Sequence, residues 1–197
     1  DKTSRVVTEK IRLFNRMKLV SYTKNHGKGY AIKRGVKVAK NDFILFSDID
    51  FSTPITELEL FMPFIKKGAD IVIGTRKVQG ATVTQHQPYL REWLGKQFTK
   101  ISNIILGLDI SDFTCGFKLF RNEVAKKLFT NAKINRWGFD SEILYLANKY
   151  TLKVVEVPIL WRNDPRTKVN LTKDILQSFS DLLTIRLNDI QGKYSNK

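Results

Sequence analysis

Short apolar segments alternate along this chain with segments whose apolar residues recur at helical spacing. Buried strands are predicted for residues 17–22, 43–46, 70–75 and 152–161, the last of them closed by Pro158. Helices are predicted for residues 6–14, 31–39, 55–67, 89–108 and 171–190. A further short strand and a helix lie within residues 111–129, and another helix begins within 137–150. Continuously apolar strands that alternate with helices indicate an α/β fold with a mostly parallel sheet.

One interval breaks this alternation. Residues 77–88, KVQGATVTQHQP, show no apolar periodicity and are predicted to form a mobile loop. The chain has no internal repeat, and its 197 residues suit one domain with a substantial core.

The charge balance narrows the kinds of partner. Lys and Arg number 34 against 19 Asp and Glu, which leaves +15 and favours an anionic partner: nucleic acid, an anionic membrane surface or a phosphorylated small molecule. A hydrophobic fraction of 42% argues against disorder. One cysteine, Cys115, excludes an internal disulfide framework and fits a reducing compartment. No apolar run reaches the roughly 18 residues that would span a bilayer.

Two carboxylates follow directly after the predicted strand 43–46. Asp48 and Asp50 stand one residue apart, and Pro54 closes the turn. Ligands of open α/β sheets bind beyond the carboxyl ends of strands, and alternation would place residues i and i+2 on the same side. Oxygen ligands of this kind suit Mg²⁺ or Mn²⁺ shared with substrate phosphates. Because a D-x-D triplet also arises by chance, a turn or helix-cap role remains the alternative.

Basic residues stand at neighbouring places. Lys28 and Gly29 belong to NHGKG, a glycine-rich approach to a helix of the kind that accepts phosphates, although a simple loop is the alternative. Arg76 ends the predicted strand 70–75, and Arg91 begins the helix after the loop. An isolated arginine is usually a surface charge, but two of them flanking an acidic strand tip favour oxyanion binding.

The ordered motifs resemble those of family 2 glycosyltransferases with the GT-A fold. They are N-x-G-K-G-x-A-x-x-x-G at 25–35, D-I-D at 48–50, G-T-R at 74–76, D-F-T-C-G-F-K-L-F at 112–120, G-F-D-S-E at 138–142 and V-E-V-P-I at 155–159. The set is most similar to the polyprenyl- and dolichyl-phosphate glucosyl- and mannosyltransferases. The resemblance implies a Rossmann-like, mostly parallel sheet flanked by helices and lacking its first strands. Residues 1–170 would form this partial domain, and 171–197 a C-terminal amphipathic helix and tail. The chain begins DKTSRVVTEK without Met, and we expect it to be a fragment.

The resemblance also implies roles for individual residues. Asp48 and Asp50 would hold Mg²⁺ or Mn²⁺, with Ser52 standing where relatives often carry a glutamine ligand. The residues implied on the donor side are Lys28, Gly29, Asp48, Arg166 and Lys168, with Arg162 in the same basic segment. Asp50, Arg76 and Arg91 would be catalytic, the two arginines holding the acceptor phosphate. Asp112, Thr114 and Lys118 would lie on the acceptor side.

The implied reaction moves a hexose from UDP-glucose or GDP-mannose to a polyprenyl or dolichyl phosphate, with inversion. A phosphate monoester is already ionised at neutral pH and needs no general base. Transfer to a polysaccharide or another alcohol is the alternative, and it would require Glu142 or Asp140 as the base. Glu142 could equally be a structural acid in a first helical turn.

The lipid acceptor implies a peripheral enzyme at the cytoplasmic face of a membrane. The helices 89–108 and 171–190 either contact that surface or simply pack on the sheet, and we expect partial membrane contact for the first. Nucleic acid is not expected as a partner, because the lysines are scattered and no aromatic platform accompanies them. His26, His86 and Cys115 are expected to have no catalytic role.

Overall fold

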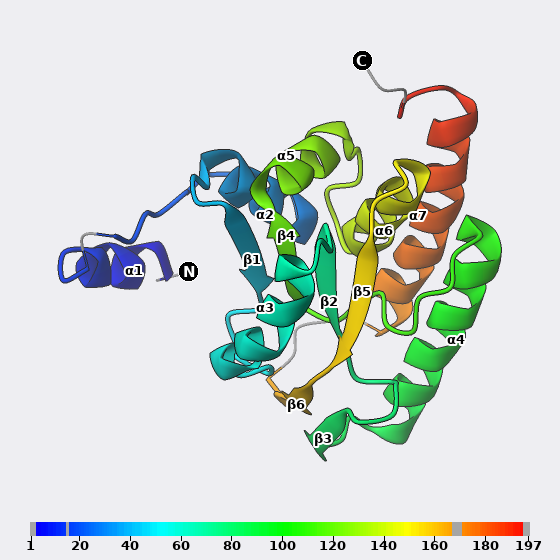
Figure 1. Ribbon diagram of the computed structural model, residues 1–197, viewed down its shortest axis with the longest axis horizontal. Coiled ribbons are helices and arrows are strands. Elements are labelled where there is room, and N and C mark those ends of the chain that lie inside the picture. Colours follow the sequence, from blue (N-terminus) through cyan, green and yellow to red (C-terminus); the bar gives the residue numbers. More distant parts are fainter. Residues whose placement is uncertain (1–2, 15, 167–170, 195–197) are drawn as a thin grey trace.

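The structure is a computed structural model that describes residues 3–14, 16–166 and 171–194. Its helices are α1 (Thr3–Ile11), α2 (Lys28–Val38), α3 (Leu58–Lys66), α4 (Tyr89–Leu106), α5 (Asn122–Asn131), α6 (Phe139–Lys149) and α7 (Leu171–Ile190), with a 3-10 turn at Ile55–Glu57. Its strands are β1 (Phe43–Ser47), β2 (Ile71–Thr75), β3 (Thr82–Gln85), β4 (Phe117–Arg121), β5 (Val154–Pro158) and β6 (Leu160–Arg162). A central sheet with helices on both sides confirms the α/β prediction (Figure 1).

The central sheet has the strand order β1-β4-β2-β5. β2 and β5 are parallel, and β4 lies antiparallel between β1 and β2. Three of the four strands therefore point the same way, and only β4 departs from the parallel arrangement that the sequence predicts. The carboxyl ends of β1 and β2 consequently lie at one edge of the sheet, separated by the start of β4.

The prediction of a loop over residues 77–88 is wrong in part. Residues 82–85 form β3, which pairs in parallel with β6 in a separate two-stranded sheet. Thr82 N donates to Ile159 O at 3.1 Å, and Val83 packs against a buried cluster. Because β6 lies about 80 residues further along the chain, this pairing left no local periodic signal.

The strand predicted at residues 17–22 is also wrong. This segment is irregular and mostly exposed, and in the described part of the chain it pairs with no strand. A strand needs a hydrogen-bonded neighbour, and apolar composition alone does not supply one. The helix before it forms as predicted but ends at Ile11 and buries none of its residues. In Figure 1, α1 projects away from the sheet and its covering helices.

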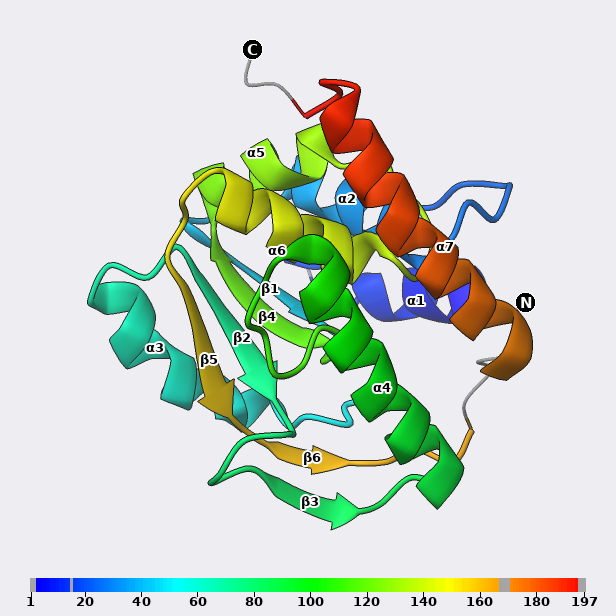
Figure 2. The ribbon, with the colours of Figure 1, turned by 90° about the vertical axis from the view of Figure 1, so that its right-hand side faces the viewer.

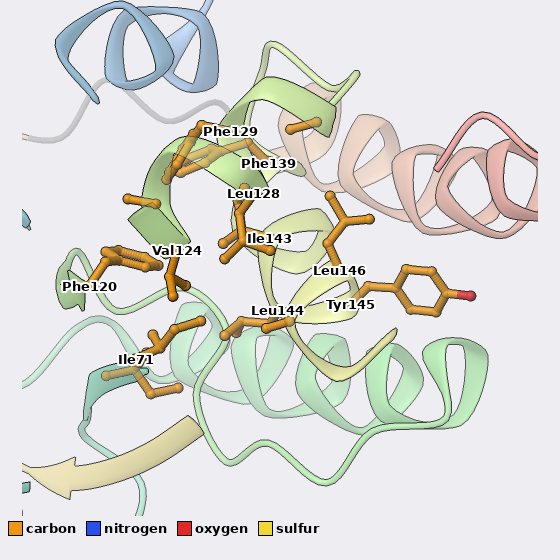
Figure 3. Packing of buried hydrophobic residues seen from close by; sticks show 14 of the residues in the cluster. Ile71, Phe120, Val124, Leu128, Phe129, Phe139, Ile143, Leu144, Tyr145 and Leu146 are labelled. Carbon is orange, nitrogen blue, oxygen red and sulfur yellow. The ribbon is translucent and has the colours of Figure 1, made fainter. Parts of the chain in front are cut away.

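Two hydrophobic clusters fill the two sides of the sheet. The larger joins the sheet to α5 and α6 and includes Leu182 and Ile185 of α7, and part of it is drawn in Figure 3. The smaller lies between the sheet and α3, where Phe61 and Ile65 are fully buried. In α6, every residue from Phe139 to Ala147 is buried, so this helix passes through the interior.

Helices α4 and α7 lie side by side on one face of the molecule (Figure 2). Phe98 and Phe179 meet edge-to-face between them, with ring centroids 5.5 Å apart. Gly107, at φ 65°, ends α4 in the left-handed conformation that favours glycine. The helices predicted at 89–108 and 171–190 are confirmed.

Leu128→Ala should lower the free energy of unfolding by about 2–5 kcal/mol, because Leu128 is fully buried in the larger cluster and its removal leaves a cavity. Urea denaturation followed by circular dichroism measures this change. Leu60→Ala on α3, where the side chain is 48% exposed, is the control and should change stability by less than about 0.5 kcal/mol. Equal effects of the two substitutions would contradict this packing.

Candidate active site

Asp48 and Asp50 lie in a tight turn just beyond β1. The amide of Asp48 donates to Gly116 O at 3.0 Å, and Asp50 Oδ1 accepts from the amide of Ser52 at 3.0 Å. Phe51 has φ 52°, an uncommon value for an aromatic residue, and it completes the turn. Strand alternation therefore does not place the two carboxylates, and that part of the prediction is wrong. Both carboxylates nevertheless line one cleft.

Gly116 sets the position of the Asp48 carboxylate. An added Cβ at residue 116 would lie 1.9 Å from Asp48 Oδ2, so the carboxylate rests directly on the glycine backbone. The backbone of residue 116 reaches this point because Phe117 pairs with Ser47 in the β1–β4 ladder. The antiparallel strand thus supplies both a hydrogen-bond acceptor and a close support for the acidic turn.

Lys28 extends from the start of α2 to the acidic turn. Its Nζ lies 2.8 Å from Asp48 Oδ1, and 5.3 Å from the ring centroids of both Phe46 and Trp137. Gly29, the next residue, faces the interior instead, where an added Cβ would lie 2.6 Å from Phe139 Cβ. Lys28 lines the cleft, whereas Gly29 serves the close packing of α2 on α6.

On the other side of the cleft, Arg76 is held by a buried carboxylate. Its Nε and Nη2 donate to Asp112 at 2.6 and 2.8 Å, Nη2 also donates to Thr114 Oγ1 at 3.0 Å, and the guanidinium lies 5.0 Å from the Trp161 ring centroid. Burial would by itself raise the pKa of Asp112, but the charge and hydrogen bonds of Arg76 hold that pKa well below its usual range. Burial would by itself lower the pKa of Arg76. The charge and hydrogen bonds of Asp112 have the larger combined effect and raise the pKa of Arg76. Arg76 is therefore a permanent, rigidly oriented cation.

Two more cations adjoin Arg76. Lys77 Nζ donates to Thr99 Oγ1 at 2.6 Å and to Gly95 O at 3.2 Å, which ties the end of β2 to α4. Burial lowers the pKa of Lys77 despite the nearby Asp112, and burial together with the charge of Arg76 lowers the pKa of Arg91. Cations crowded in this way favour an anion as their ligand.

A cleft of about 810 Å³ lies between the acidic turn and these cations. The sequence-predicted site residues that line it are Lys28, Asp48, Asp50, Arg76, Arg91, Thr114 and Arg166. Arg166 Nη2 pairs with Asp164 Oδ2 at 2.6 Å, and the amide of Arg162 donates to Ser52 O at 2.8 Å. The end of β6 therefore meets the acidic turn. Lys168 lies outside the described residues.

Asp112 and Lys118 are buried beneath the cleft and do not line it. Lys118 Nζ donates to Phe113 O at 3.0 Å and Cys115 O at 2.6 Å, and pairs with Asp140. Burial raises the pKa of Asp140, against the opposing charge of Lys118. These contacts make Lys118 a support for the floor of the cleft, while the carboxylate of Asp140 lines it.

Glu142 faces away from the cleft. Its carboxylate accepts hydrogen bonds from the amides of Lys133 and Ile134 at 2.9 and 2.8 Å and from the Tyr194 hydroxyl at 2.5 Å. This fully buried side chain has a structural role. Cys115 is also buried, and burial raises the pKa of its thiol to about 11, which makes the thiol unreactive near neutral pH.

Sequence reasoning missed Trp137, Trp161 and Lys77, all of which line the cleft. Trp161 is the last residue of a predicted strand and Lys77 stands two residues after another, so their positions carried a signal. Trp137 stands just before the G-F-D-S-E motif and gave none. His86 lines the cleft too, and its Nδ1 lies 2.9 Å from Glu92 Oε1.

The two carboxylates of the acidic turn suit a divalent ion that also binds a substrate. Asp48 and Asp50 offer carboxylate oxygens, the ligands that Mg²⁺ and Mn²⁺ prefer. Among the described residues, no group of three or more His, Cys, Asp or Glu side chains could hold a metal ion. Two protein ligands with the remainder from phosphate and water are the usual arrangement for Mg²⁺.

Solved structures of the GT-A type share this fold. A similar solved structure is glucosyl-3-phosphoglycerate synthase from Mycobacterium tuberculosis in complex with UDP, with a TM-score of 0.58 and 16% identity over 94% of this chain and 65% of that one. Mannosyl-3-phosphoglycerate synthase from Rubrobacter xylanophilus gives a TM-score of 0.57 at 16% identity, over 87% and 54%. At such identities the likeness shows the fold alone.

The chain belongs to glycosyl transferase family 2, whose model matches residues 1–129. It is 34% identical to a dolichyl-phosphate beta-glucosyltransferase (ALG5C) of Trichomonas vaginalis over 100% of this chain and 60% of that protein. It is 28% identical to the dolichyl-phosphate beta-glucosyltransferase of Homo sapiens over 98% and 62%. The chain thus spans about 60% of the length of these relatives. The family and the fold that the motifs implied are confirmed.

Gly116→Ala should weaken Mn²⁺ binding by roughly ten- to a hundredfold, because the new Cβ displaces the Asp48 carboxylate from its support. Electron paramagnetic resonance titration in the presence of UDP measures the affinity. Gly35→Ala in α2 is the matched control, since no heavy atom lies within 4 Å of its added Cβ, and it should leave the affinity unchanged. Unchanged affinity in Gly116→Ala would contradict the role of the glycine.

Asp112→Asn should lower the free energy of unfolding by about 3–5 kcal/mol at pH 7, because Arg76 loses its buried counter-charge. The pKa of Asp112 is lower in the folded state, so its stabilisation is present at neutral pH and is lost as the pH falls below the unfolded value near 3.8. Urea denaturation between pH 2 and 7 should therefore show the wild-type advantage shrinking below about pH 4. A pH-independent difference would rule out the ionic origin.

Proposed function

We propose that this chain is the catalytic part of an inverting, metal-dependent glycosyltransferase that transfers a hexose from a nucleotide sugar to a dolichyl or polyprenyl phosphate. One observation carries the proposal: a carboxylate turn and a cluster of arginines line a single cleft. The names of the relatives support glucose as the hexose and dolichyl phosphate as the acceptor. UDP-glucose is accordingly the first donor to test, and GDP-mannose the second.

The donor diphosphate would lie on the acidic side of the cleft. Asp48 and Asp50 would hold Mg²⁺ or Mn²⁺, which when bound neutralises charge on the leaving diphosphate. Solved structures of the similar synthase include a complex with Mn²⁺ and UDP-glucose, which supports this choice of ions. Lys28, held by Asp48 between two aromatic rings, and Arg166 supply further positive charge. Lys168 is proposed for the same role.

The acceptor phosphate would lie against Arg76 and Arg91. Asp112 and Thr114 hold Arg76 in a fixed orientation. Binding of the acceptor would therefore not have to order this side chain, which lowers the entropic cost of binding. Asp112 and Lys118 lie beneath the cleft, where Asp112 would position Arg76 and Lys118 would support the cleft floor. Thr114 lines the cleft itself. In this arrangement the acceptor phosphate would lie across the cleft from the donor diphosphate.

The reaction requires no proton transfer. An oxygen of the ionised phosphate attacks the anomeric carbon, the bond from that carbon to the diphosphate breaks, and the nucleoside diphosphate leaves with the bonding electrons. Attack from the face opposite the leaving group inverts the anomeric carbon. An alcohol acceptor would need a general base, yet Glu142 is committed to two backbone amides and a hydroxyl, and Asp140 is paired with Lys118.

A dolichyl tail does not leave the bilayer, so we propose that the enzyme works as a peripheral protein at the cytoplasmic face of a membrane, with no nucleic-acid partner. Among the described residues, no helix has the length and apolar character needed to cross a membrane. The net charge of +15 supports attraction to anionic lipid.

The test incubates the full-length protein with UDP-[¹⁴C]glucose, Mn²⁺ and dolichyl phosphate, and measures label extracted into the lipid phase. Arg91→Ala should lower kcat/KM by roughly a hundredfold or more, because the acceptor phosphate loses a partly buried cation. Arg76→Ala should do the same, with thermal unfolding as a check, since it leaves the buried Asp112 with only the more distant Lys77, at 3.7 Å, as a cationic partner.

Glu142→Gln is the control and should keep kcat/KM within about threefold, because Glu142 contacts no part of the cleft. Absence of lipid-extractable label with either UDP-glucose or GDP-mannose would refute the proposed reaction. Full activity of Arg91→Ala together with loss in Asp140→Asn would instead favour an alcohol acceptor.

A further inference from the structure

We propose that the indole ring of Trp137 is a platform on which the hexose of the sugar-nucleotide donor rests. The proposal deepens the proposed function and rests on it for the position of the donor diphosphate. Trp137 belongs to the α5–α6 segment (residues 132–138), which joins those two helices. It binds the donor without taking part in bond formation, and its share of the donor affinity comes from the hexose alone.

The three tryptophans of the chain have different surroundings. Trp161 is 9% exposed, and the guanidinium of Arg76 lies 5.0 Å from its ring centroid. Trp93 on α4 is 47% exposed, but it does not line the cleft. Trp137 is 39% exposed and does line the cleft. It is therefore the tryptophan that combines an open surface with a place in the cleft wall.

The α5–α6 segment has no regular secondary structure, yet its backbone is tied at several points. The amides of Lys133 and Ile134 donate to the carboxylate of Glu142 at 2.9 and 2.8 Å. The carbonyl of Asn135 accepts from the amide of Tyr30 at 3.0 Å, which joins the segment to α2. A backbone held in this way has little conformational freedom left to lose when a ligand binds.

Helix α7 fixes the residue that follows Trp137. Asp181 Oδ2 accepts from the amide of Gly138 at 3.2 Å, and Gln177 Nε2 donates to Asp181 Oδ1 at 3.0 Å. An added Cβ at residue 138 would lie 2.4 Å from Asp181 Cβ, so the glycine allows α7 to approach this closely. The backbone that presents Trp137 to the cleft is thus held by α2, α6 and α7 together.

The neighbours of the ring lie on the donor side of the cleft. Lys28 Nζ is 5.3 Å from the Trp137 ring centroid and 2.8 Å from Asp48 Oδ1. In the proposed function Asp48 faces the donor diphosphate, so Trp137 stands one cation away from that group. Two sugars are bonded directly to the diphosphate, the hexose and the ribose, whereas the nucleobase lies beyond the ribose.

The chemistry of the wall favours the hexose over the ribose. A glucose pyranose carries C–H groups on its faces, which pack on the electron-rich face of an indole, and hydroxyls on its rim. Asp140, three residues after Trp137, brings a carboxylate to the same cleft, and a carboxylate accepts strong hydrogen bonds from hydroxyls. Ribose is a smaller ring that carries the base, and it has no comparable apolar face. Aromatic rings with a few placed polar groups are the usual lining of a small-molecule site.

Isothermal titration calorimetry of the full-length protein with UDP-glucose and with UDP, each in the presence of Mn²⁺, tests the platform. Trp137→Ala should weaken UDP-glucose binding by roughly tenfold and leave UDP binding within about twofold, because only the hexose loses its contact. Trp137→Phe keeps a flat ring and should bind UDP-glucose within about threefold of the wild type. Retained UDP binding also shows that the donor side of the cleft is intact in Trp137→Ala.

Trp93→Ala is the matched control. Trp93 is exposed to a similar extent, 47% against 39% for Trp137, and it stands on α4 outside the cleft lining. This substitution should leave the affinities for both UDP-glucose and UDP unchanged.

Three results would overturn the proposal. Trp137→Ala could bind UDP-glucose as tightly as the wild type. Its affinities for UDP and UDP-glucose could fall equally, which would assign the ring to the nucleoside or the diphosphate. Trp93→Ala could show the same selective loss, which would remove the link to the cleft.

Failure of the platform and failure of the proposed function have different signatures. A selective loss of UDP-glucose affinity in Trp137→Ala, in a protein that transfers no glucose to dolichyl phosphate, would refute the proposed acceptor and leave the platform standing. Full transfer by Trp137→Ala at UDP-glucose concentrations below KM would refute the platform and leave the proposed function standing.

Discussion

The position of β4 between β1 and β2 is the constraint on which the cleft depends. Ser47 pairs with Phe117 and Ile73 pairs with Lys118, so the segment that leads into β4 emerges between the carboxyl ends of β1 and β2. That segment supplies Gly116 to the acidic turn on one side and Asp112 to Arg76 on the other. One short stretch of chain thus supports both halves of the site, which explains why its residues are buried although the chemistry takes place above them.

The cleft has carboxylates on one side and cations on the other, and buried side chains beneath the cleft pair with a charged residue on each side. Arg76 has its counter-charge in Asp112, and Asp140, in the cleft wall, has its own in Lys118. Both pairs are buried, where an unpaired charge would cost several kcal/mol, so neither partner can be removed without affecting the folding of the cleft. Breaking such pairs would change stability and activity together, and separating the two effects requires measurements of both.

Much of the fold could be read from the sequence, because its helices and buried strands have clear periodicity or composition. The acidic turn and Arg76 could also be found, since functional residues of α/β sheets follow strand ends. Residues 82–85 escaped prediction because their only strand signal is a distant partner. Gly116 and Trp137 escaped for a similar reason: their roles exist only where separate segments meet. For Glu142 the sequence left a general base and a structural acid open, and the structure supports the structural role.

The strand order also has a consequence for how this chain folds. Among the described residues, no strand pairs with the strand that comes next in the sequence. β1 pairs with β4, and β2 pairs with β4 and β5. Every ladder therefore closes a long loop, which slows folding and leaves Ile71, Val72 and Ile73 without both neighbouring strands on the ribosome until β4 and β5 have been made. During synthesis this strand, which is fully buried in the folded protein, is an open edge, and the nascent chain is expected to depend on chaperone protection until β5 emerges.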